Sequence, residues 1–488
     1  MTVTNRGTQV LNNHWENLGE SVPECLRWYE KPTVDCILDT DRKISEGTCR
    51  DVTLGVYGLI RCHGASFSVD WDSLRRTAET YGVNAQADKH WVLNTLRNIP
   101  FIELYHPDVD AYVQSFRDNT ACVCVNHSLG QIIQNILIKA VTNCLFPLSA
   151  LGENPRPPFI MGFTEKEPFT PRMCARVILL GAKTYLGDIK AVNEIDVRVM
   201  VVSPAQAVFG IFMDEFAKNF ALYHEYAHIV LGHLGRVTTN QDELQADCFA
   251  TNCLAFQLRN AVTGDEELQV LAQLVTLCMY APVLLMDLLG VMQLLRGGKF
   301  SESHPHPLAR KQFIRGVVAK ILPSDRGFAS FRRELEILSD SLFEYVYNFL
   351  NVSLVPETKT GATIDAKAMY VPWDQIDIGN KDLDVLRTRI IWLRSSNGGV
   401  IYLNTAAKRA IVPLFTTEGA ASRAAVLIEG VFGIPVEIRR VDGISRSDFE
   451  RILLDKELPE ELDCEIVYEG SDKFRSLLAN LMAQSPGS

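Results

Sequence analysis

One stretch, residues 224–247, constrains the fold more than any other part of the chain. It opens with His-Glu-Tyr-Ala-His, in which His224 and His228 are four residues apart. An α-helix turns about 100° per residue, so both imidazoles fall on one face of a helix, about 40° apart. Glu243 and Asp247 repeat this spacing further along the chain. The pattern predicts two helices that direct histidines and carboxylates toward a common point.

These side chains are typical donors of a catalytic zinc site. We expect His224 and His228 to donate ring nitrogens, and Glu243 a carboxylate oxygen, to one Zn²⁺ ion. The fourth coordination position then stays open for water, whose pKa zinc lowers to ~7. Glu225 follows His224 directly in the sequence. It is placed to accept the proton of that water and to pass it to the leaving amine.

Two neighbouring side chains fit supporting roles. We expect Asp247 to accept the free ring N–H of a ligand histidine and to fix its tautomer, although Glu243 and Asp247 could exchange roles. His233 lies nine residues after His224. On a continuous helix this separation is about 180°, which is the wrong face for the metal. We therefore predict that His233 is structural.

The helix that carries the two histidines is expected over residues 214–234. Ser203 followed by Pro204 is a helix start signal, although Gly210 could break the helix before the motif. Gly235 is expected as the residue that ends it, because glycine readily adopts the left-handed conformation found after a helix.

A hydrolase of this kind also needs a donor for the oxyanion that develops in the reaction. His304, His306 and Arg310 form the densest group of donors downstream of the motif. We interpret His304 and Arg310 as candidates for this catalytic role. The alternative is a rigid loop, stiffened by prolines, whose side chains are solvated.

Composition limits the class of protein and its partners. A chain of 488 residues is longer than one hydrophobic core usually organises, so two or three domains are expected. The net charge of −11 disfavours binding by phosphate neutralisation, so we predict a protein substrate and no nucleic acid. Twelve cysteines without regular spacing suggest reduced thiols, and the polar N-terminus lacks the features of a signal peptide. We expect a cytoplasmic protein.

Residues 268–295 are apolar over a length that could cross a bilayer. The stretch contains Pro282 and Asp287, and an unpaired carboxylate at that depth would cost at least ~2.5 kcal/mol. We therefore expect a core helix that packs on the zinc-binding helices, and no membrane association.

The residues around the motif also resemble known families. HEYAH followed by ELQAD is similar to the gluzincin metallopeptidases. The metal-ligand, base and orienting positions of that family fall on His224, His228, Glu243, Glu225 and Asp247. The run HPHPLAR resembles the His-Pro-x-x-x-x-Arg element of HtpX-like peptidases, which matches His304 and Arg310. HEYAHIVLGH, preceded by PDVDAYV and CVCVN, resembles the Lit-type phage-exclusion peptidases over about residues 100–320.

Pattern and resemblance together predict an α+β fold. We expect a mostly helical zincin-like metallopeptidase core whose small mixed sheet contains the strands in PDVDAYVQSF and TACVCVN, plus a C-terminal α/β domain. The predicted divisions are a helical N-terminal region at 1–95, the metallopeptidase domain at 96–352, a linker at 353–372 and the small α/β domain at 373–488.

The predicted function is zinc-dependent cleavage of an intracellular protein. A zinc-bound water activated by Glu225 would be the nucleophile, and bacterial or phage defence or regulated proteolysis would be the setting. The alternative is a non-catalytic regulatory or binding protein in which zinc staples two helices. Glu225 favours the enzyme, because a purely structural site has no use for a base between its ligands.

Overall fold

A computed structural model describes most of the chain from residue 51 onward. The described ranges are 51–104, 110–116, 120–133, 171–186, 188–195, 204–261, 265–297, 305–324, 326–350 and 370–376, with short segments between 389 and 468. The chain divides into two units, Met1–Ile378 and Gly379–Ser488. The predicted linker at 353–372 lies mainly outside the described residues, and the predicted start of the last domain at 373 is a few residues before this division.

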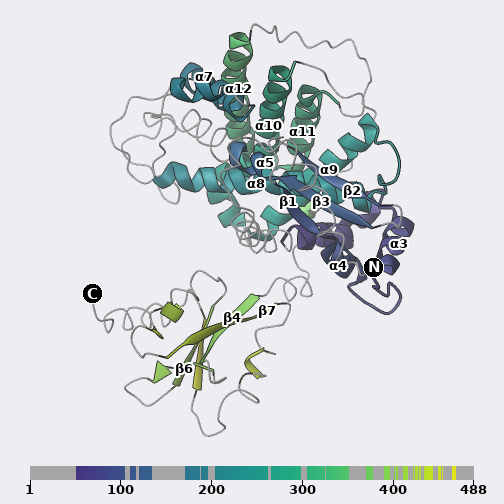
Figure 1. Ribbon diagram of the computed structural model, residues 1–488, viewed down its shortest axis with the longest axis vertical. Helices are drawn as coiled ribbons and strands as arrows, with labels where there is room; N and C mark the ends of the chain where they lie inside the picture. Colours follow the sequence, from purple (N-terminus) through teal and green to yellow (C-terminus); the bar gives the residue numbers. More distant parts are fainter. Residues whose placement is uncertain are drawn as a thin grey trace. The chain divides into compact units, whose positions relative to one another are not determined.

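The larger unit is built mainly from helices. After a helix at residues 51–63 come η1 (Gly64–Ser66), α3 (Trp71–Thr80), α4 (Trp91–Asn98), α5 (His127–Ile132), α7 (Pro171–Tyr185), η4 (Ile189–Glu194), α8 (Pro204–Val230), α9 (Asn240–Ala261), α10 (Asp265–Leu295), α11 (Pro307–Ile321), α12 (Arg326–Phe349) and η6 (Trp373–Gln375). Helix α8 packs along α9 and α10, and α11 packs against both α9 and α10 (Figure 1).

A small mixed sheet lies against α8. Its strands are β1 (Phe101–Leu104), β2 (Ala111–Ser115) and β3 (Ala121–Asn126), in the order β1-β3-β2. Strand β3 pairs with β1 in parallel and with β2 antiparallel. The two strands expected from the sequence are thus confirmed as β2 and β3, and β2 and β3 both contact α8.

Helix α8 differs from its predicted extent at both ends. It begins at Pro204, as the Ser203-Pro204 start signal indicates, and runs through Gly210 without a break. It ends at Val230, before the predicted end at Leu234. The prediction placed the terminating glycine too far along the chain, because Gly232 and Gly235 both have positive φ values, +72° and +78°, and the first of them follows the helix end.

The turn after α8 satisfies the last carbonyl groups of the helix. Gly232 donates its N–H to Ile229 O at 3.3 Å, and His233 donates its N–H to His228 O at 2.9 Å. These two bonds, with glycine in the left-handed conformation, form a Schellman motif. The turn folds the chain back, so His233 lies over the last turn of α8.

The end of α8 also packs against the start of α3. Asp70 caps α3 by accepting the N–H of Ser73 at 2.9 Å, and its own N–H donates to Val230 O at 2.9 Å. A Cβ added at Gly232 would overlap the Asp70 side chain. A second close approach occurs at Gly55, where a Cβ would overlap the ring of Tyr223 on α8. Side-chain-free backbone at both points allows the N-terminal helices to reach the motif helix.

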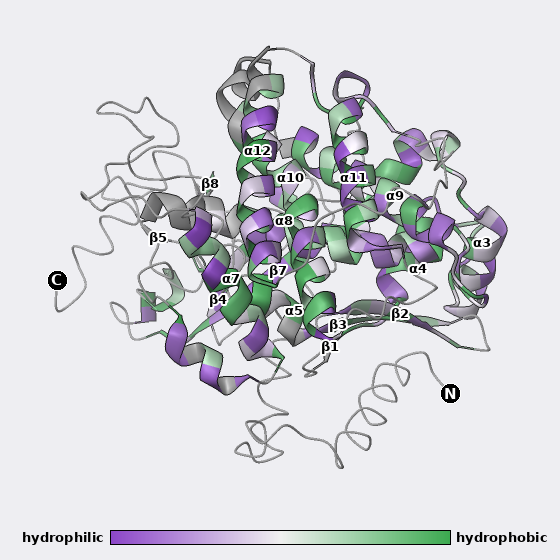
Figure 2. Ribbon diagram, turned by 90° about the horizontal axis from the view of Figure 1, so that it is seen from above, coloured by the Kyte–Doolittle hydropathy of each residue, from purple (hydrophilic) through white to green (hydrophobic). Residues whose placement is uncertain are grey.

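Helix α10 is apolar and central to the unit. It packs against α8, α11 and α12, which surround it in Figure 2. In the described part of the chain, one helix is long and apolar enough to cross a membrane, over Leu274–Leu295; its most apolar 18-residue window has mean hydropathy 2.0 and is 89% buried. Its carboxylate Asp287 is paired: Lys311 of α11 donates to Asp287 Oδ1 at 2.8 Å and to Asp340 Oδ1 of α12 at 2.9 Å.

The smaller unit contains two short sheets. Strand β4 (Arg389–Ser395) pairs antiparallel with β7 (Val436–Asp442), and β6 (Ala410–Leu414) lies between β5 (Leu403–Asn404) and β8 (Cys464–Tyr468). Backbone hydrogen bonds of 2.8 Å in both directions join Ile391 to Phe415. Apolar side chains from β4, β6 and the neighbouring helical segments form its core. The predicted α+β class, mostly helical with small sheets, is confirmed.

Candidate metal centre

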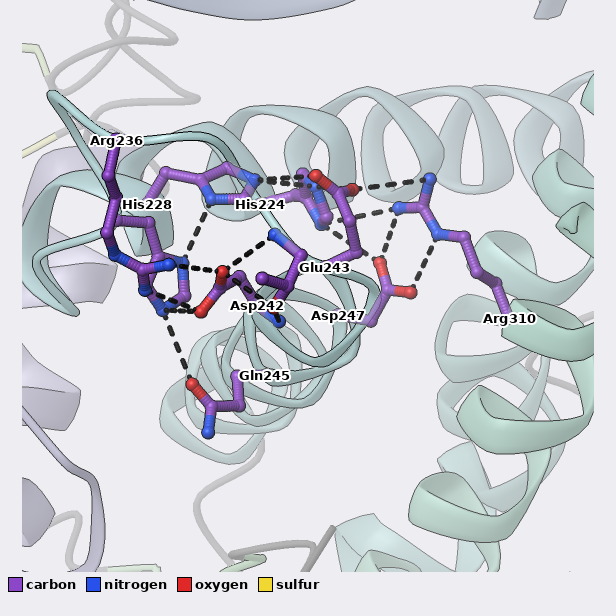
Figure 3. Close-up of polar contacts among 10 residues, drawn as sticks. His224, His228, Arg236, Asp242, Glu243, Gln245, Asp247 and Arg310 are labelled. Atoms are coloured by element: carbon purple, nitrogen blue, oxygen red, sulfur yellow. Dashed lines mark hydrogen bonds and ion pairs between the residues drawn. The ribbon is translucent and has the colours of Figure 1, made fainter. Parts of the chain in front are cut away.

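Helices α8 and α9 bring three buried donor atoms together (Figure 3). His224 Nε2 lies 3.1 Å from His228 Nε2 and 3.2 Å from Glu243 Oε2, and His228 Nε2 lies 3.6 Å from Glu243 Oε1. Ligands about 2.05 Å from a tetrahedral zinc ion are separated from each other by about 3.3 Å. The spacing of the three donors therefore fits a zinc-sized ion.

Asp247 sets the protonation of the first histidine. His224 Nδ1 lies 2.9 Å from Asp247 Oδ1, and a carboxylate can only accept a hydrogen bond there. In the neutral imidazole the proton is therefore on Nδ1, and Nε2 presents a lone pair toward Glu243. Lone pairs and a carboxylate that converge in a buried place are stabilised by a cation, so the group His224, His228 and Glu243 could hold a metal ion.

Arg310 of α11 holds Asp247 from the other side. Its Nε donates to Asp247 Oδ2 at 2.8 Å and its Nη2 to Asp247 Oδ1 at 2.6 Å, and Asp247 is fully buried. Arg310 Nη2 also lies 3.4 Å from His224 Nδ1. These contacts place Arg310 behind His224 as a support for Asp247. Its predicted role as an oxyanion donor stays a prediction.

The other two candidate donors give different results. His304 lies outside the described residues. His306 is the N-cap of α11, and its Nδ1 accepts the N–H of Leu308 at 3.1 Å, with Pro307 at the first helical position. Residues 306 and 307 thus start the helix that carries Arg310 to the site.

Charge in the metal-free site is distributed unevenly. Burial lowers the pKa of His224, but hydrogen bonds to Asp247 and Glu243 outweigh it and raise that pKa to about 9. Burial and the charge of His224 lower the pKa of His228 to about 3. Burial raises the pKa of Glu243, but its contacts with His224 and the charge of Arg310 lower it to about 2. Of these three side chains, only His224 therefore carries an added proton near neutral pH.

Glu225 has the properties of a proton carrier. It follows His224 on α8 and is buried, and its pKa is raised to about 8, chiefly by burial. The negative charges of Asp110, before β2, and of Glu243 contribute to this raised pKa, and the positive charges of His224 and Arg310 oppose it. A carboxyl group with a pKa near neutrality can both accept and release a proton at physiological pH.

The pattern-based assignment of His233 to the opposite face of α8 is wrong. Because α8 ends at Val230 and the chain turns at Gly232, His233 Nδ1 lies 3.0 Å from His228 Nδ1. Its Nε2 faces Gln245 and Asp242 of α9. In the sequence, Gly232 was one of two glycines that could end the helix, and the helix ends before it, so the 180° separation does not apply.

Comparison with known proteins adds one match. Residues 196–312 match the family model described as Peptidase U49. This range spans α8, α9, α10 and the first part of α11, so it contains all the site residues described above. No curated protein and no solved structure matches the chain. The match supports proteolytic function for a chain whose buried His224, His228 and Glu243 could bind a metal ion.

Proposed function

We propose that the protein is a zinc-dependent endopeptidase with a zincin-like core and the gluzincin ligand arrangement. The observation that carries this proposal is the convergence of His224 Nε2, His228 Nε2 and a Glu243 carboxylate oxygen, with Glu225 beside the first ligand. Two imidazoles and one carboxylate suit zinc, whereas magnesium and calcium prefer oxygen donors. The similarity to a peptidase family over the same residues supports hydrolysis of peptide bonds.

The chemistry divides between the metal and the chain. Zinc held by these three ligands would lower the pKa of water in its open position and polarise the carbonyl of the scissile bond. Glu225 accepts the proton of the attacking water and donates it to the amine of the departing peptide. Asp247, held by Arg310, keeps the proton of His224 on Nδ1, so that Nε2 stays available as a ligand.

The substrate we propose is an intracellular protein, without binding to nucleic acid. The net charge of −11 supports this choice, because an acidic chain repels phosphate backbones. Cleavage in bacterial or phage defence is the proposed setting. Its support is the resemblance of HEYAHIVLGH, PDVDAYV and CVCVN to Lit-type peptidases.

Two substitutions separate the enzyme from a zinc-stapled binding protein. Glu225→Gln keeps all three ligands, so we expect a full zinc complement by atomic absorption and loss of cleavage of an unfolded protein such as reduced casein. His228→Ala removes a ligand, so we expect loss of zinc and of cleavage. Full zinc content with undiminished cleavage by Glu225→Gln would sink the mechanism. If the zinc-loaded wild-type protein cleaves nothing and His228→Ala unfolds, the alternative of a non-catalytic protein in which zinc joins two helices would be favoured.

A further inference from the structure

The two proposed ligand histidines differ in what lies behind them. His224 has a carboxylate, Asp247, at its Nδ1. His228 instead has a third imidazole: His233 Nδ1 lies 3.0 Å from His228 Nδ1, and the ring centroids are 5.1 Å apart. His233 is buried, with 4% of its surface exposed. Two facing ring nitrogens form a hydrogen bond only if one of them carries a proton and the other does not. The question is therefore which of the two Nδ1 atoms is protonated.

The partners of His233 decide which nitrogen carries its proton. Its Nε2 lies 3.3 Å from Gln245 Oε1 and 3.5 Å from Asp242 Oδ1. Asp242 is held as an anion by Arg236, which donates to its two oxygens at 2.7 and 2.6 Å, and by Thr239. Both atoms that face Nε2 are therefore acceptors, so His233 Nε2 carries the proton. Nδ1 of neutral His233 is then an acceptor.

The tautomer of His233 determines the tautomer of His228. Since His233 Nδ1 accepts, His228 Nδ1 must donate, and the lone pair of His228 is left on Nε2. This is the atom that faces His224 Nε2 and Glu243. The backbone bond from His233 N to His228 O, 2.9 Å long, fixes the two residues relative to each other independently of their rings.

We propose that His233 is a positioning residue for zinc: it holds His228 in the tautomer that presents Nε2 to the metal, and Gln245 and Asp242 hold His233 in turn. The inference rests on the zinc site proposed above. It assigns the first two turns of α9 two tasks. Glu243 is itself a proposed ligand, and Asp247 holds His224. Asp242 and Gln245, on the neighbouring face, hold His233 and through it His228.

Zinc affinity, measured by competition with a chelator, tests the proposal. His233→Leu removes the acceptor, and loss of such an outer partner lowers metal affinity about 10–100-fold. His233→Asn places an amide oxygen near the position of Nδ1, and we expect it to restore most of the affinity. The visible spectrum of the Co²⁺-substituted protein should change in His233→Leu and resemble the wild type in His233→Asn. Wild-type zinc affinity and an unchanged cobalt spectrum in His233→Leu would overturn the proposal.

The unaltered protein provides a test that does not depend on the folding of variants. In zinc-loaded protein with ¹⁵N-labelled histidine, long-range ¹H–¹⁵N correlations should show the proton of His233 on Nε2 and that of His228 on Nδ1. A His233 ring protonated on Nδ1 would contradict the assignment. Neither affinity, the cobalt spectrum nor the tautomer depends on peptide hydrolysis. A wild-type protein that binds zinc and cleaves nothing would therefore overturn the proposed function and not this inference.

Discussion

Adding a single methyl group at Gly232 tests how the end of α8 builds the site. In Gly232→Ala the new residue keeps a φ of +72°, which costs an L-residue about 1–2 kcal/mol. Its Cβ would also overlap Asp70, and overpacking of this kind costs about 1–3 kcal/mol. Alanine restricts the unfolded chain, which offsets about 0.4–1 kcal/mol. The expected loss of stability is about 1–5 kcal/mol in total.

Gly235→Ala is the matched control. Gly235 has a φ of +78°, but nothing lies within 4 Å of the position of its Cβ. It therefore shares the backbone cost and the unfolded-state offset and lacks the overlap. Gly232→Ala should be less stable than Gly235→Ala by about 1–3 kcal/mol. Urea unfolding of the metal-free protein measures the free energy of unfolding of each variant, with hydrogen exchange in peptides from α3 and the end of α8 as the probe.

A third variant identifies the source of the difference. Asp70→Gly removes the side chain that the new Cβ would meet, and glycine as an N-cap costs only a few tenths of a kcal/mol. In the Asp70→Gly background, Gly232→Ala should cost no more than Gly235→Ala does. Zinc affinity should fall in Gly232→Ala, because the turn carries His233, and stay unchanged in Gly235→Ala. Equal stability losses at the two glycines, or a Gly232→Ala cost that persists without Asp70, would refute the packing argument.

Three further predictions concern charge. Because the pKa of His224 is about 9 and that of Glu225 about 8 without metal, zinc binding at pH 7 should release the proton of His224 and most of that of Glu225. Apparent affinity should then rise at least tenfold per pH unit up to about pH 8; calorimetry in buffers of different ionisation enthalpy would show no buffer dependence if this is wrong. Asp247→Asn should lower zinc affinity about 10–100-fold in chelator competition, and wild-type affinity would contradict its orienting role. Burial raises the pKa of Asp287, despite Lys311, from 3.8 to about 6, so its contribution to stability is present below pH 4 and lost as pH rises through 6. The wild type should lose on the order of 3 kcal/mol relative to Asp287→Asn over that range in urea unfolding, and parallel pH profiles would refute this.

The arrangement of the three donor side chains was predictable because it depends on local periodicity. His224 and His228 lie within one helix, as do Glu243 and Asp247, so residue spacing alone sets which side chains share a face. The structure places the three predicted donors within 4.8 Å of one another. That the two helices face each other was inferred from metal chemistry, since two imidazoles and one carboxylate are a donor set for one zinc ion.

His233 shows where periodicity fails. The 180° separation holds only while the helix continues, and the sequence offers two glycines, Gly232 and Gly235, as places where it could end. Choosing between them requires knowing that Asp70 approaches the turn. That contact joins residues far apart in the sequence, so no local pattern contains it.

Other long-range features could not be predicted from the sequence either. The parallel pairing of β1 with β3 depends on how the chain crosses between them. The role of Arg310 depends on α11 packing against α9, which puts the guanidinium on Asp247. For Asp287, the cost of an unpaired buried carboxylate predicts that it has a partner. That this partner is Lys311 could not be predicted from the sequence.

The proposed function requires Glu225 to act as the base in zinc-dependent peptide hydrolysis. The most direct measurement is mass-spectrometric detection of newly formed protein termini after zinc-loaded protein is incubated with a cell lysate, in parallel with zinc-loaded Glu225→Gln. We expect termini that appear with the wild type and are absent with Glu225→Gln at equal zinc content. The same termini from both proteins, at the same rate, would contradict it.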